Sequence, residues 1–203
     1  MRFFLLLIFL IGTVYADESQ GRKPELGFWL GASNPFPGSE TSRVLNTSLG
    51  FGLFGRIQWP YNLYTEAGIS AANYPSLTER SLTTVPVYGA LAYKLPFELP
   101  VSIFLKAGGG YSYVIARPAN TAKWDPMAML GTEVSFVAGK KVRIGLRVDY
   151  LRIFETIGTD IPAEAKRFYL SPLDRDYRLF NPNYYKLHDG EFFHFALMVS
   201  FLL

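Results

Sequence analysis

Residues alternate between two kinds along most of this chain: large and apolar at one position, small or charged at the next. The pattern is clearest in residues 130–150, on either side of the turn Gly139-Lys140-Lys141. After the turn, the apolar positions are Val142, Ile144, Leu146, Val148 and Tyr150. The positions between them are Arg143, Gly145, Arg147 and Asp149. Successive side chains of a strand point to opposite faces, so this stretch predicts a hairpin with one apolar and one polar face.

The same alternation marks eight segments, each long enough for one strand. They are residues 25–33, 47–59, 63–74, 84–95, 101–117, 127–138, 142–154 and 191–203. The fourth segment contains Pro86, which we expect to weaken the first hydrogen bonds of that strand. A chain of 203 residues with eight such strands predicts one all-β domain.

The connections between these segments alternate in length. Longer ones cover residues 34–46, 75–83, 118–125 and 156–190, whereas residues 60–62, 96–100 and 139–141 form short turns. Every short turn therefore lies at one end of the predicted sheet and every long loop at the other. An even number of strands connected in this way is typical of bacterial outer-membrane barrels, with short periplasmic turns and longer extracellular loops.

A soluble lipocalin-like barrel has the same number of alternating strands but points its apolar face inward. Two features favour an apolar face that points outward into lipid. The polar face is rich in glycine, which a narrow eight-stranded lumen requires because its side chains must interdigitate. Aromatic residues of the apolar face gather at the two ends of the strands, as lipid-facing girdles do. They are Trp59, Tyr93 and Phe201 at the short-turn end, and Tyr111, Tyr113, Tyr150 and Phe193 at the long-loop end.

The N-terminus predicts export. Arg2 precedes a short apolar run from residue 3 to 14, and Val14-Tyr15-Ala16 places small residues before Asp17. This arrangement is that of a signal peptide, so we expect residues 1–16 to be cleaved and residues 17–203 to form a single barrel domain. No later apolar run reaches the length of a membrane-spanning helix. The chain has no Cys, so no disulfide holds the fold together.

Composition excludes several function classes. The net charge is only +3, from 20 basic and 17 acidic residues, which gives no reason to expect a nucleic-acid partner. The sequence contains no metal-ligand cluster, phosphate-binding loop or nucleotide motif. We therefore expect neither a cofactor nor a metal.

The last segment, with alternate apolar residues through Phe201 to Leu203, resembles the C-terminal insertion signal of outer-membrane barrels. The whole chain after residue 16 resembles the small barrels of the OmpA/OmpX type. The resemblance implies an eight-stranded antiparallel up-and-down transmembrane β-barrel in the bacterial outer membrane. It implies no particular activity, so we expect a structural or surface-interaction role.

Seven charged residues fall on the predicted inward face. They are Arg56, Glu66, Lys106, Glu133, Arg143, Arg147 and Asp149. Charges in a narrow interior are costly unless they are paired. Arg56 and Glu66 are equidistant from the turn at Tyr61, and Glu133 and Arg147 are equidistant from Lys140, so we expect each pair to meet across its hairpin. This interpretation gives an ion-paired polar core and no open pore; the alternative is a proton or ion path through the same groups.

Lipid A deacylases and palmitoyltransferases use this architecture, so an enzyme is the alternative from another class. The only histidines are His188 and His194, and no His-x-Ser motif is present. We therefore expect no catalytic residues, with His194 a hydrogen-bonded residue of the lumen. A carrier of small apolar molecules is a third hypothesis.

The connection 156–190 is long enough to suggest a function of its own. It mixes arginine with aromatic residues, which are common at interfaces. The candidate contact residues are Arg167, Phe168, Tyr169, Arg175, Tyr177, Arg178, Tyr184 and Tyr185. We expect them to contact an extracellular ligand or a host or surface partner, while the barrel wall contacts outer-membrane lipid. The alternative is that the segment extends the strands beyond the membrane or packs over the barrel mouth.

Overall fold

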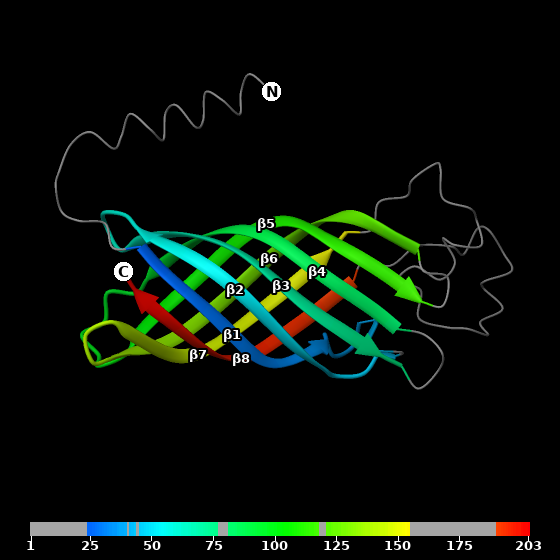
Figure 1. Ribbon diagram of the computed structural model, residues 1–203, viewed down its shortest axis with the longest axis horizontal. Coiled ribbons are helices and arrows are strands. Elements are labelled where there is room, and N and C mark those ends of the chain that lie inside the picture. The colour runs from blue at the N-terminus through cyan, green and yellow to red at the C-terminus, as the bar shows by residue number, and fades with distance from the viewer. Residues whose placement is uncertain (1–23, 40, 44, 77–80, 118–120, 155–189) are drawn as a thin grey trace, which may run out of the picture.

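The strands of this protein close into one barrel in a computed structural model that describes residues 24–39, 41–43, 45–76, 81–117, 121–154 and 190–203. Eight strands pair antiparallel in chain order, and β1 pairs with β8 to close the sheet. They are β1 (Pro24–Pro35), β2 (Ser48–Gln58), β3 (Leu63–Pro75), β4 (Ser81–Lys94), β5 (Ser102–Arg117), β6 (Thr121–Ala138), β7 (Val142–Ile153) and β8 (Gly190–Leu202). A short 3-10 helix, η2 (Thr41–Arg43), interrupts the first long connection. The predicted up-and-down barrel is confirmed (Figure 1). The predicted signal peptide, residues 1–16, lies outside the described residues.

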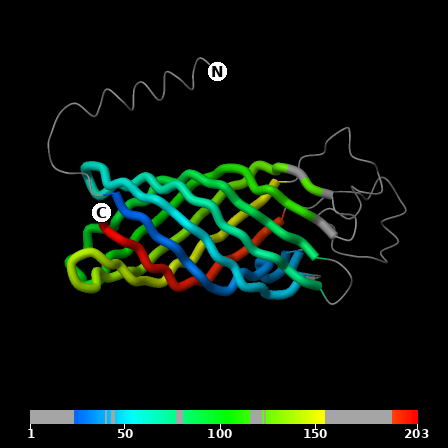
Figure 2. The backbone as a smooth tube through the Cα atoms, in the orientation of Figure 1, coloured from blue at the N-terminus to red at the C-terminus, as the bar shows by residue number. Residues whose placement is uncertain are grey.

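The strand register fixes the stagger of the barrel, which is the offset along β1 after one circuit around the sheet. A path from strand to strand through hydrogen-bonded partners starts at Glu25 and returns to β1 at Pro35, ten residues along the strand. Its steps are Glu25, Arg56, Glu66, Ala90, Gly108, Met129, Leu151, Phe192 and Pro35. This stagger tilts the strands against the barrel axis, as the tube in Figure 2 shows. Eight tilted strands enclose an interior that side chains can fill.

The two faces of the wall have the polarity predicted for a membrane barrel. Outward residues in mid-strand are apolar and exposed, with Leu105 at 50% and Leu197 at 64%. Inward residues include charges that are almost fully buried, with Glu133 at 0% and Lys106 at 3%. The soluble-barrel alternative is therefore wrong, because it requires the apolar face to point inward. Among the described residues, no helix is long and apolar enough to cross a membrane.

Two strands begin earlier than the sequence pattern predicted. We expected residues 118–125 to be a loop, but β6 already begins at Thr121 and pairs with the end of β5. Likewise β4 begins at Ser81 and not at residue 84. Alternation at the outer ends is weak because a strand that extends beyond lipid has no need of apolar residues on its outward face. The connections before β4 and before β6 are correspondingly shorter than predicted.

Pro86 lies in the middle of β4, not near its start, but its predicted effect on pairing is present. The ladder between β3 and β4 is continuous to Ile69–Val87 and resumes at Ala72–Thr84. The two pairs between them, which would include Pro86, are missing on this side, whereas Pro86 keeps its place opposite Ser112 of β5. Proline has no N–H to donate, so it can keep its place in the ladder with one neighbouring strand while the ladder with the other strand is interrupted.

Glycine on the inward face makes room for large side chains, as predicted. A Cβ on Gly52 would collide with the indole of Trp29, and one on Gly131 would collide with the carboxylate of Asp149. At the short-turn end, Tyr61 and Asn62 adopt left-handed conformations, with φ of 61° and 60°. Two consecutive residues of this kind match the right-handed twist of the flanking strands β2 and β3.

Candidate functional site

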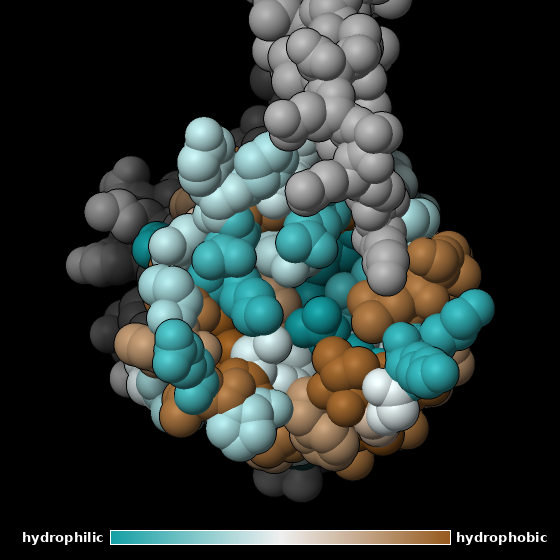
Figure 3. Space-filling model, turned by 90° about the vertical axis from the view of Figure 1, so that its left-hand side faces the viewer, coloured by the Kyte–Doolittle hydropathy of each residue, from teal (hydrophilic) through white to brown (hydrophobic). Residues whose placement is uncertain are grey.

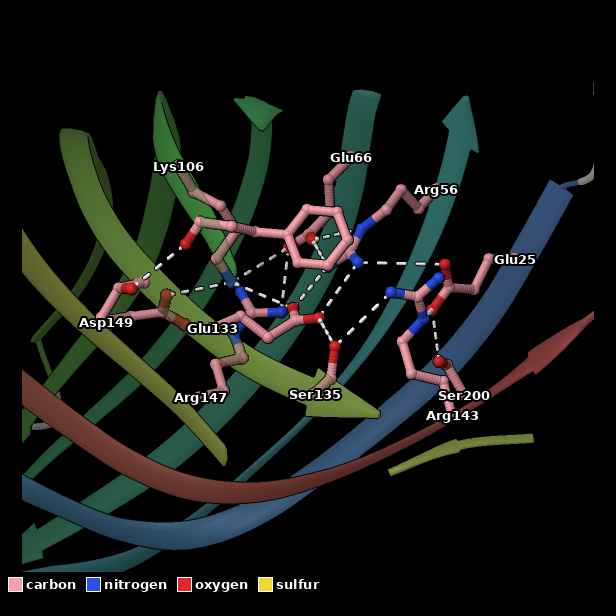
Figure 4. Close-up of polar contacts among 12 residues, drawn as sticks. Glu25, Arg56, Glu66, Lys106, Glu133, Ser135, Arg143, Arg147, Asp149 and Ser200 are labelled. Atoms are coloured by element: carbon pink, nitrogen blue, oxygen red, sulfur yellow. Dashed lines mark hydrogen bonds and ion pairs between the residues drawn. The ribbon is translucent and has the colours of Figure 1, made fainter. Parts of the chain in front are cut away.

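The charged residues of the lumen form one buried network (Figure 4). Its members are Glu25, Arg56, Glu66, Lys106, Glu133, Arg143, Arg147 and Asp149. Four are basic and four acidic, so the network is neutral when all are ionised. All eight are buried, and Arg143 is the most exposed at 7%. The seven charged residues predicted to face inward therefore all do so, and Glu25 joins them.

Arg56 lies at the centre of this network. Its Nη2 lies 2.7 Å from Glu66 Oε2 and 2.5 Å from Glu133 Oε2, and its Nη1 donates to Glu133 Oε1 over 3.1 Å. The predicted Arg56–Glu66 pair across the β2–β3 hairpin is therefore present. The contact with Glu133 was not predicted, because it crosses the lumen from β2 to β6. Two carboxylates on one guanidinium make strong charge-assisted hydrogen bonds that fix its orientation.

Glu133 and Arg147 lie opposite each other in the ladder, as predicted. The predicted contact between their side chains is wrong. The two residues are direct partners in the β6–β7 ladder. Yet Glu133 binds Arg56, whereas Arg147 contacts Asp149 on its own strand and places Nη1 2.9 Å from Glu66 Oε1. Arg147 also donates to Tyr88 Oη over 2.9 Å. Both side chains extend across the lumen because it offers each of them a better partner than its neighbour in the ladder.

Lys106 supplies the remaining charge in the middle of the barrel. Its Nζ lies 3.2 Å from Asp149 Oδ1, and 3.8 Å and 3.9 Å from oxygens of Glu66 and Glu133. The ammonium therefore lies among three carboxylates from three strands. A compact charge without fixed geometry suits this position better than a second planar guanidinium would.

Glu25 connects the network to the seam where the barrel closes. Its carboxylate accepts a hydrogen bond from Ser200 of β8 and lies 3.3 Å from Arg143 Nε of β7. Arg56 Nη1 of β2 lies 3.9 Å away. We missed Glu25 in the sequence because it precedes the first apolar residue of its strand. Its position in the two-residue alternation, which it shares with Gly27 and Trp29, would have placed it inside the barrel.

Aromatic rings form the wall around these charges. Arg56 lies 4.8 Å and Arg143 5.2 Å from the centroid of the Phe104 ring. Arg147 lies 5.3 Å from the centroid of Phe54. Ring faces attract cations and exclude water. Viewed from the short-turn end, hydrophilic residues lie in the middle of the barrel, and the rim around them carries both hydrophobic and hydrophilic residues (Figure 3).

The interior toward the long loops is different, because apolar side chains fill most of it. They are Ala72, Tyr74, Leu82, Tyr88, Ala90, Val114, Met127, Met129, Leu151, Ile153 and Phe192. The polar groups here include the hydroxyls of Ser33 and Tyr74 and the imidazole of His194. Tyr74 Oη lies 2.6 Å from Ser33 Oγ and 3.3 Å from His194 Nε2.

His194 has the surroundings of a residue held in place. The strand register puts it between Ser33 of β1 and Asp149 of β7, and its ring centroid lies 5.3 Å from that of Trp29. It is 3% exposed. Within the part of the chain that is described, no group of His, Asp and Glu residues is arranged to hold a metal ion. The loop residues Arg167, Phe168, Tyr169, Arg175, Tyr177, Arg178, Tyr184 and Tyr185, and also His188, lie outside the described residues.

Comparison with known proteins gives a fold but no relative by sequence. No protein-family model matches the chain, and no curated protein matches it in sequence. Among solved structures, Neisserial surface protein A aligns over 92% of this chain and all of its own, with 9% identity and a TM-score of 0.55. The Pseudomonas aeruginosa outer-membrane protein OprG aligns over 92% of this chain and 99% of its own, with 10% identity and a TM-score of 0.49. The chain therefore has the fold of the small eight-stranded outer-membrane barrels that it resembles in sequence pattern.

Proposed function

We propose that this protein is a non-conducting barrel of the bacterial outer membrane, with a structural or surface-interaction role. One observation carries the proposal: a neutral, buried charge network and an apolar cluster together fill the lumen of a barrel whose outer wall is apolar. An apolar outward face suits contact with lipid. A lumen occupied by paired side chains leaves no continuous path for water or ions.

The test is to reconstitute the purified chain and to measure location, folding and conductance separately. We expect the protein to fractionate with outer membrane and to need detergent to stay monodisperse. Folded and boiled samples should migrate differently on a gel, and planar bilayers should show no steady conductance. A stable monomer in buffer without detergent would contradict the membrane location, and a reproducible channel from the folded form would contradict the closed lumen.

The proposal includes the absence of catalysis. His194 supports it, since its Nε2 lies beside Tyr74 Oη and its ring is buried among aromatic residues. A catalytic base must reach a proton on its substrate, and substrate does not reach a buried ring. Mass spectra of lipid A from cells with the parent protein and with His194→Ala should be identical. A lipid A species that disappears in His194→Ala cells, with the barrel still folded, would establish an enzyme.

A surface role rests on the segment 156–190, whose arginine and aromatic residues suit a contact surface. Replacing residues 160–185 with a short Gly-Ser linker should leave the heat-dependent gel shift unchanged. Any binding of the intact cell surface to a partner through this segment should be lost. Loss of folding in the shortened chain would instead give the segment a structural role.

A further inference from the structure

Three neighbouring strands, β5, β6 and β7, bring an amine and a carboxylate together inside the lumen. Lys106 of β5 is the ladder partner of Gly131 of β6, and Gly131 is the ladder partner of Asp149 of β7. The two charged side chains meet over the strand between them because Gly131 has no side chain. A Cβ there would collide with Asp149 Oδ1 and would lie 3.2 Å from Lys106 Cε. Glycine inside a strand often marks such a close approach.

The amine and the carboxylate lie close together without a well-formed hydrogen bond. Lys106 Nζ lies 3.2 Å from Asp149 Oδ1, and both residues are almost completely buried. Among the residues that the structure describes, neither of these two atoms has a hydrogen-bond partner. Buried polar atoms without a hydrogen bond are uncommon in folded proteins, and here two of them face each other.

Arg147 and Glu66 complete the surroundings of this pair. Arg147 Nε donates to Asp149 Oδ2, the carboxylate oxygen that does not face the amine. Arg147 Nη1 lies 2.9 Å from Glu66 Oε1, and the same Glu66 oxygen lies 3.8 Å from Lys106 Nζ. One guanidinium therefore holds the carboxylate of Asp149 and also keeps a second carboxylate beside the amine.

We propose that Lys106 and Asp149 condense into an intramolecular amide that joins β5 to β7 across β6. A bond forms between Lys106 Nζ and the carboxyl carbon of Asp149, and the bond from that carbon to Oδ1 breaks. The amide keeps one proton of the ammonium, and the others leave with Oδ1 as water, so the two charges cancel and no co-reactant is needed. In a chain without Cys, this amide is a covalent link between strands that a disulfide would otherwise provide.

The neighbouring groups supply the chemistry of the condensation. Glu66 accepts a proton from the amine and returns it to Oδ1 as that oxygen leaves, which is general acid–base catalysis. Arg147 remains bonded to Oδ2, where negative charge develops while the carbon is tetrahedral. The fold holds the reacting atoms together, and the dry interior protects the amide from hydrolysis. The reaction removes one basic and one acidic residue from the network, so the network stays neutral.

The test follows the intact mass of the full chain as it folds from urea into detergent. The chain kept in urea should have the mass of its sequence, and the folded chain should be lighter by one water molecule. Peptide mapping should find Lys106 and Asp149 in one cross-linked fragment. Lys106→Gln, which barely changes the mass, should fold and keep the full mass. Glu66→Gln should fold and lose the water about 100-fold more slowly, the contribution of one general acid–base group.

The matched control is Lys141→Gln, which removes the same charge from an exposed turn and should lose the water as the parent does. Each sample is first checked for the heat-dependent gel shift, and the parent in urea gives the full-mass reference even where a variant does not fold. A folded parent with the full mass would overturn the proposal. A water that is also lost from Lys106→Gln would lie elsewhere in the chain and would overturn it too. Equal rates for Glu66→Gln and the parent would overturn the part assigned to Glu66.

Discussion

The two halves of the lumen are filled by different physical means. Toward the short turns, eight charged residues and the rings around them occupy the interior, and each charge has at least one partner. Toward the long loops, apolar side chains such as Leu151, Ile153 and Phe192 occupy it. The outer half is packed as in a soluble core, where shape decides the energy. In the inner half, the energy depends on whether every charge keeps its partner.

The difference predicts how each half responds to the loss of one side chain. A truncated apolar residue leaves a cavity whose cost scales with the volume lost. A lost member of the charge network leaves its partners ionised in a place that water hardly reaches. The inner half should therefore be the more sensitive of the two, even where fewer atoms are removed.

The largest effect should come from Arg56→Met. This change removes the guanidinium that binds both Glu66 and Glu133 while keeping much of the side-chain volume. We expect the free energy of unfolding to fall by roughly 3–5 kcal/mol, since two buried carboxylates lose their main partner. Equilibrium unfolding in urea, in liposomes, measures this change. Lys141→Met, at an exposed turn, is the control and should leave the midpoint unchanged.

A smaller effect should follow from Leu151→Ala in the outer half. Leu151 is 3% exposed and belongs to the apolar cluster. We expect a loss of about 2–4 kcal/mol from lost burial and the cavity left behind. Leu146→Ala on the lipid face is the matched control, and it should cost less because lipid can fill the space. If the two substitutions cost the same, the outer half is not packed as a core.

Double-mutant cycles should separate contact from register in the inner half. Arg56 and Glu133 lie on strands that are not neighbours but make direct hydrogen bonds. Glu133 and Arg147 are ladder partners whose side chains bind elsewhere. With Arg→Met and Glu→Gln as the single changes, we expect a coupling energy of about 1–3 kcal/mol for the first pair and a clearly smaller one for the second. A reversed order would mean that the network in lipid has exchanged partners.

The same two pairs show how far the sequence could predict this molecule. A period of two residues decides which face a side chain occupies, so the inward position of Arg56, Glu133 and Arg147 could be predicted. Equidistance from a turn decides the ladder partner. Neither rule describes the closed barrel, where a long side chain can reach across the lumen to a strand far away in the sequence. The Arg56–Glu133 contact spans 77 residues, and only the closed geometry reveals it.

Strand ends were predicted less well for a related reason. Alternation is enforced where one face meets lipid, and this constraint ends where the strand leaves the membrane. Residues 121–126, with Lys123, Asp125 and Pro126, therefore gave no strand signal, although they pair with β5.

The smallest effect concerns the polar residues within the apolar half. Tyr74→Phe removes one hydroxyl, which bonds Ser33 and His194, but keeps the ring that stacks on Phe192 at 4.5 Å. No cavity forms, so the expected loss is about 0.5–1.5 kcal/mol, the net value of one hydrogen bond. Adding Ser33→Ala should restore part of this loss, because the hydroxyl left without its partner is removed as well. Unfolding curves of the two single variants and the double variant decide the point. A loss for Tyr74→Phe as large as that for Arg56→Met would show that hydrogen bonds, and not packing, hold the outer half together.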